Sequence, residues 1–175
     1  MEQFDSVLEL INMRSFSSLW YWIVLATLWS SLSYFVLGVP LDMLRRGRRE
    51  GGQPQADVEN LVRITTSRVL HLVDESLLLL VGLGFFWLSG LVVLAVLYNI
   101  EIAQAVLLLF APVSVVAWLS IRLCRGIVAE DCRGEALYRR LLFHRRCIQG
   151  IGMVAIFVTA MYGMWHNLNS MFLNG

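Results

Sequence analysis

Long runs of apolar residues alternate with polar segments along this chain. Each run is close to the roughly 20 residues that a helix needs to cross the apolar core of a bilayer. The pattern therefore predicts four transmembrane helices, over residues 19–39, 77–97, 102–123 and 148–166. Because only residues 98–101 separate the second run from the third, these two helices are expected to be antiparallel neighbours.

The polar segments carry helical patterns of their own. Near the start of the chain, apolar residues recur at the spacing of one helical face, at Phe4, Val7, Leu8 and Ile11. This spacing predicts a short amphipathic helix over residues 1–16 that lies on the membrane surface. Segments 40–76 and 124–147 are Arg-rich, and the helical pattern in each runs on into the next apolar run. We therefore expect an all-α, integral membrane four-helix bundle with helical extensions, forming one domain over residues 1–175.

The positions of the charges orient this bundle. Every basic residue is an Arg, and almost all of them lie on one side of the predicted bundle. The other side holds only Arg14, because the turn at 98–101 and the residues after His166 contain none. The positive-inside rule therefore places segments 40–76 and 124–147 in the cytoplasm and both termini on the outer side.

The composition narrows the class of protein and of partner. Apolar residues make up 58% of the chain, against about 45–50% in a soluble domain. The net charge of +1 favours neither nucleic acid nor an acidic substrate as a partner. Residues 1–15 lack the basic start and long apolar run of a signal peptide, so none is expected.

The residue types that bind cofactors and metals are poorly placed. His166 is expected at the opposite end of the bundle from His71 and His144, so it cannot share a haem with either of them. His71 and His144 could meet at the cytoplasmic surface, but a haem there would lie half outside the membrane. The Cys residues lack the close pairing that zinc and iron–sulfur sites favour: Cys124, Cys132 and Cys147. No nucleophile–base pattern or phosphate-binding loop is present. We expect no cofactor, no metal and no catalytic residue.

Charged residues gather at the cytoplasmic rim of the predicted bundle. None of the four spans has a charge near its centre, which argues against a proton-coupled carrier or an ion channel. Asp74 and Glu75 lie at the edge of the second run, where an unpaired carboxylate is costly. We expect them to pair with Arg122 and Arg125 of the third helix. The cluster is interpreted as an ion-pair clamp or, alternatively, as a functional site that includes His71.

Two further groups of residues indicate contacts with lipid or protein. Small residues form one stripe on the fourth helix, at Gly152, Ala155, Thr159 and Gly163. Such a stripe lets helix backbones approach closely, either inside the bundle or against another subunit. The second group is a basic cluster that is expected to bind anionic lipid of the inner leaflet: Arg139, Arg140, Arg145 and Arg146.

Two segments of the chain, Leu10–Trp22 (LINMRSFSSLWYW) and Gly150–Met161 (GIGMVAIFVTAM), resemble a family of small uncharacterised four-helix inner-membrane proteins of α-proteobacteria. Some members are labelled as components of an iron–sulfur assembly complex, but this chain supplies no cluster ligands and no functional residue is carried over. The resemblance implies a bacterial inner membrane. The outer side, to which the arginine distribution assigns both termini, is then expected to be the periplasm.

These observations favour a non-catalytic accessory or assembly subunit of a larger membrane complex, in contact with other membrane subunits. One alternative is a small membrane subunit of a transporter. A third is a membrane enzyme with a site at the inner rim, for which only His71, Asp74 and Glu75 are available.

Overall fold

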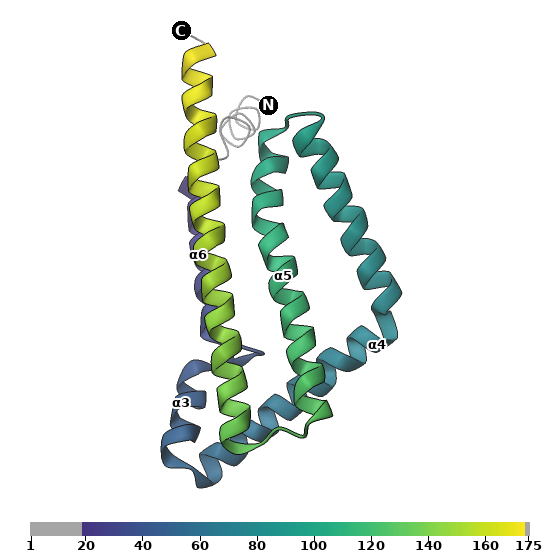
Figure 1. Cartoon of the computed structure of the whole chain (residues 1–175), viewed down its shortest axis with the longest axis vertical. Coiled ribbons are helices and arrows are strands. Elements are labelled where there is room, and N and C mark those ends of the chain that lie inside the picture. The colour runs from purple at the N-terminus through teal and green to yellow at the C-terminus, as the bar shows by residue number, and fades with distance from the viewer. Residues whose placement is uncertain (1–18, 174–175) are drawn as a thin grey trace, which may run out of the picture.

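A computed structural model describes residues 19–173, and nearly all of them are helical (Figure 1). The described helices are α2 (Leu19–Tyr34), α3 (Leu41–Glu50), α4 (Gly52–Val96), α5 (Glu101–Ala129) and α6 (Gly134–Leu173). A two-stranded antiparallel ribbon, β1 (Phe35–Val36) and β2 (Val39–Pro40), joins α2 to α3. The expected all-α class is confirmed. The amphipathic helix expected over residues 1–16 lies outside the described residues.

Within residues 19–173, three helices are long and apolar enough to cross a membrane: α4, α5 and α6. Three of the expected spans, 77–97, 102–123 and 148–166, fall largely or wholly within these longer helices. The helix expected over residues 19–39 differs, because α2 ends at Tyr34. The backbone reverses at Leu37 and Gly38, whose φ angles are 50° and 75°, and this turn pairs β1 with β2 instead of continuing the helix.

Helix α4 bends sharply between its two halves. Ser76 has φ −117° and ψ 17°, which departs from helical geometry. The first half, residues 52–75, runs across the lower end of the molecule, and the second half, residues 77–96, rises beside α5 (Figure 1). The bend falls where the polar segment gives way to the apolar run.

The second half of α4 and α5 form an antiparallel hairpin. Asn99 adopts a positive φ of 51° in the connecting turn. The Gln104 side chain closes the hairpin, because its Nε2 donates hydrogen bonds to the Ala95 carbonyl oxygen over 3.0 Å and to Asn99 Oδ1 over 3.2 Å. Gln104 is buried, so these bonds satisfy an NH2 group that would otherwise be costly in apolar surroundings.

One end of the molecule is formed by α3, the first half of α4 and the α5–α6 connection, and we call it the Arg-rich end. The larger of two buried hydrophobic clusters lies there. It joins the β ribbon, α3, α4, α5 and α6 through side chains that include Val36, Leu44, Val58, Ile127 and Leu141. Gly47 marks a close approach, since a Cβ there would lie 2.6 Å from the Tyr138 hydroxyl oxygen. An ion pair of 2.6 Å between Arg48 and Glu135 also joins α3 to α6. The two Arg-rich segments therefore fold together as one packed unit.

The second cluster packs α2 against α5 and α6. Its buried members are Leu25, Trp29, Val116, Ile148 and Ala155. The Tyr21 hydroxyl adds a polar link, donating to the Ala105 carbonyl oxygen over 3.2 Å. The second half of α4 contributes nothing to this cluster.

Candidate functional site

The small-residue stripe of α6 faces the interior of the chain. Gly152, Ala155, Thr159 and Gly163 are all buried. A Cβ at Gly152 would lie only 2.7 Å from Trp29 Cε3, so the α6 backbone lies almost directly against the indole ring of α2. The close approach that the spacing predicts is therefore made to a neighbouring helix of the same chain.

The second half of α4, in contrast, is largely uncovered by the rest of the described chain. The most apolar 18-residue stretch of this helix has none of its residues buried. Its glycines, Gly82, Gly84 and Gly90, have no atoms within 4 Å of an added Cβ. This apolar helix therefore leaves most of its surface uncovered by the described chain.

An apolar cleft of about 710 Å³ opens between α4, α5 and α6. One wall is α4, with Leu88 and Val92, and the opposite wall is α6, with Gly150 and Val154. Pro112 of α5 lines the cleft between them. Nothing lies within 4 Å of a Cβ added at Gly150. The cleft has the polarity and open access that another apolar helix or a lipid chain requires.

The acidic residues at the rim each have a partner. Arg125 Nη2 lies 3.8 Å from Asp74 Oδ1, joining α5 to α4. Glu75 pairs with His71 one turn earlier on its own helix, at 3.4 Å. Arg122 does not reach either acid and instead places its guanidinium 5.5 Å from the centroid of the Trp118 ring.

The four arginines proposed for lipid have different surroundings. Arg145 donates from Nε to the Ser33 carbonyl oxygen over 3.0 Å, which ties α6 to the end of α2. Arg140 forms an ion pair with Glu130. This hydrogen bond and charge hold the pKa of the Glu130 carboxyl below its usual range. Arg139 and Arg146 are exposed.

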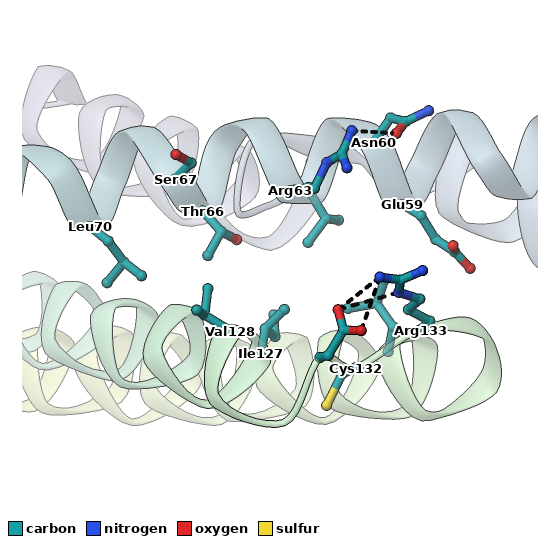
Figure 2. Close-up of a pocket in the computed structure, with 13 residues that line it drawn as sticks. Glu59, Asn60, Arg63, Thr66, Ser67, Leu70, Ile127, Val128, Cys132 and Arg133 are labelled. Carbon is teal, nitrogen blue, oxygen red and sulfur yellow. Dashed lines mark hydrogen bonds and ion pairs between the residues drawn. The ribbon is translucent and has the colours of Figure 1, made fainter.

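A more polar pocket of about 490 Å³ lies between the first half of α4 and the end of α5 (Figure 2). Thr66 and Leu70 point from α4 toward Val128 (Figure 2). The Thr66 hydroxyl is buried without a hydrogen-bond partner in the part of the chain described. Glu59 at the edge accepts a hydrogen bond of 2.9 Å from the Gly134 backbone N–H. The pocket is a seam between packed elements. Arg133 pairs with Asp131, and Arg63 donates a hydrogen bond to Asn60 Oδ1.

The residues considered for metals and haem do not converge. Among residues 19–173, no group of three or more His, Cys, Asp or Glu side chains is placed to hold a metal ion. His144 is buried, and its Nε2 lies 3.1 Å from the Ser120 hydroxyl oxygen of α5. Ser120 in turn donates to the Val116 carbonyl oxygen over 2.9 Å. His144 therefore serves as a polar contact between α5 and α6.

A second groove, between α5 and α6, was not anticipated from the sequence. It lies at the Arg-rich end and has a cavity of about 550 Å³. Arg122, Arg139 and Arg140 line it together with apolar side chains of both helices. Sequence reasoning grouped Arg122 with the acids and Arg139 with lipid, because neighbours across two helices are not visible in spacing along one.

No protein family, curated protein or solved structure matches this chain. The functional interpretation therefore depends on the residues and geometry described above.

Proposed function

We propose that this chain is a non-catalytic accessory or assembly subunit of a larger complex in a bacterial inner membrane. In this proposal α4, α5 and α6 cross the bilayer, α2 packs against them within it, and the Arg-rich end faces the cytoplasm. The thirteen arginines on one side of the apolar runs, against Arg14 on the other, support this orientation.

The observation that carries the proposal is the apolar cleft between α4 and α6. Gly84, Leu88 and Val92 recur every four residues along α4, and Gly150, Val154 and Val158 do so along α6. Residues with this spacing share one face of a helix. The α6 wall presents an uncovered glycine followed by branched side chains, and the α4 wall presents Leu88 and Val92, with the uncovered Gly84 one turn earlier on that helix. Such surfaces suit close contact with a helix of a partner subunit.

The rim residues give less support to an enzyme. Asp74, Glu75 and His71 are exposed. Asp74 pairs with Arg125 of α5, and Glu75 lies 3.4 Å from His71 on α4. None of the three lines the pockets and cleft described above. We therefore assign Asp74 to the contact between α4 and α5, and Glu75 and His71 to a contact along α4 itself.

Affinity purification of tagged chain from membranes, in a mild detergent, tests the proposal. Gly150→Leu adds a side chain to the α6 wall of the cleft, and Gly84→Leu adds one a turn before Leu88 of the α4 wall. At both positions an added Cβ meets no other side chain or helix within 4 Å. Both variants are expected to keep the stability of the parent chain and to lose the same co-purifying membrane protein.

Gly82→Leu is the matched control. Gly82 lies two residues before Gly84, about 200° around the helix, and its added Cβ is equally free of contacts. We expect this variant to retain the partner. If all three variants retained it, or if the parent chain captured no membrane protein reproducibly, the proposal would be wrong.

A further inference from the structure

The groove between α5 and α6 combines an apolar floor with a cationic rim. Its floor is formed by Leu119 and Leu123 of α5 and by Phe143 and Cys147 of α6. His144 also lines the groove, and its Nε2 is hydrogen-bonded to Ser120. The floor therefore favours hydrocarbon over a small polar ligand.

The rim of this groove carries excess positive charge. Arg122 and Arg139 pair with no carboxylate among residues 19–173. Arg140 pairs with Glu130, so the three guanidinium groups face a single carboxylate. Arg122 lines the groove, and its guanidinium lies 5.5 Å from the centroid of the Trp118 ring one turn earlier on α5. A guanidinium group binds a phosphate through two parallel hydrogen bonds, and two of these groups are available.

The groove also lies at the right depth for a phospholipid. Arg122 falls at the end of the apolar run 102–123, and Cys147 immediately precedes the run 148–166. In the membrane placement proposed above, the rim is at the level of the lipid phosphates and the floor is at the level of the first acyl carbons.

We propose that this groove binds one anionic phospholipid, with its phosphate between Arg122 and Arg139 and an acyl chain along Leu119, Leu123 and Phe143. The site differs from the basic cluster expected from the sequence, since it includes Arg122 and excludes Arg145, which is committed to the Ser33 carbonyl. It rests on the proposed membrane placement but not on the proposed partner.

Native mass spectrometry of purified, delipidated chain tests the site, with phosphatidylglycerol or phosphatidylcholine added back. The parent chain is expected to bind one phosphatidylglycerol more tightly than phosphatidylcholine. The double variant Arg122→Gln/Arg139→Gln is expected to weaken phosphatidylglycerol binding by at least about ten-fold, because each Arg contributes attraction to the anionic headgroup. Binding of phosphatidylcholine should change much less.

The control Arg45→Gln/Arg49→Gln removes two exposed arginines from α3 that pair with no carboxylate in the described part of the chain, with the same change in net charge. It should bind phosphatidylglycerol like the parent chain, and an equal loss in the control would show a general charge effect and overturn the site.

Inorganic phosphate should not compete with phosphatidylglycerol, because the floor of the groove contributes to binding. Effective competition by phosphate would mean that the arginines alone act and would also overturn it. Leu123→Trp, which keeps every charge but fills the floor, should weaken binding as well, and unchanged binding would contradict the acyl contact. These results do not depend on whether a protein partner is captured.

Discussion

At the scale of single residues, the contact between Gly152 and Trp29 shows how little room this bundle has. The α6 backbone at Gly152 lies against the indole ring because no side chain intervenes, and the added Cβ would approach Cε3 within 2.7 Å. Trp29 is itself buried in the cluster that joins α2, α5 and α6. The ring therefore cannot move aside without displacing its other neighbours.

We predict that Gly152→Leu lowers the melting temperature of the purified chain. Overpacking of a close-packed core costs about 1–3 kcal/mol, and the indole ring is a rigid obstacle. The measurement is thermal unfolding in detergent. Gly150→Leu, two positions earlier and without a neighbour within 4 Å of its added Cβ, is the control and should leave the melting temperature nearly unchanged. Equal effects of the two substitutions would contradict the assigned packing.

The sequence could predict part of this contact. The spacing of Gly152, Ala155, Thr159 and Gly163 places them on one helical face, and all four are buried together in the structure. The neighbour that covers them could not be derived, because it depends on where α2 ends and how the chain then turns. The grouping of Arg122 with Arg139 depends likewise on how α5 and α6 pack side by side.

At the scale of elements, the apolar runs predicted the long helices, but their ends and bends required the structure. The run 19–39 carries no charge, yet the helix ends at Tyr34 and a ribbon of two short strands follows. Apolar composition does not distinguish a helix from a buried turn such as the one between Val36 and Val39, which are both fully buried. Pro40 then permits α3 to begin as a separate helix, since its fixed φ of −61° and missing N–H suit a helix start.

The two halves of α4 illustrate the same limit. Sequence reasoning expected a helical extension that runs on into the second span, and the structure has one element from Gly52 to Val96. The direction change at Ser76 could not be foreseen, because no Pro or Gly marks it. The Arg125–Asp74 ion pair lies next to this bend. Its charges are more than half exposed, so we ascribe a positioning effect to the pair and little stability.

At the scale of the whole molecule, the chain is packed tightly at one end and open at the other. The Arg-rich end has a continuous buried cluster that draws on every described helix except α2. Farther along the helices, α2, α5 and α6 stay in contact while the second half of α4 contacts mainly α5 (Figure 1). An arrangement of this kind stabilises the chain from the Arg-rich end and leaves the apolar cleft free for a partner.

The proposed orientation predicts the result of a topology assay. A reporter enzyme that is active only in the periplasm should be active when fused after Gly175 and inactive when inserted at Gly52. Gly52 follows α3 with a positive φ of 56°, at a turn where an insertion disturbs little packing. The reporter inserted at Gly52 should be inactive because the excess of arginine around that turn disfavours export of the segment. The reverse pattern of activity would contradict the orientation.

The central claim is that the cleft between α4 and α6 holds a helix of another subunit, and photo-crosslinking in intact membranes tests it most directly. A photoreactive residue would replace Val92 or Val154, which line the cleft, or Phe86, which is 71% exposed and lies about 160° around α4 from Leu88. The account predicts the same discrete protein adduct from Val92 and Val154 and none from Phe86. Adducts with lipid alone at all three positions, or one protein adduct of equal yield at all three, would contradict it.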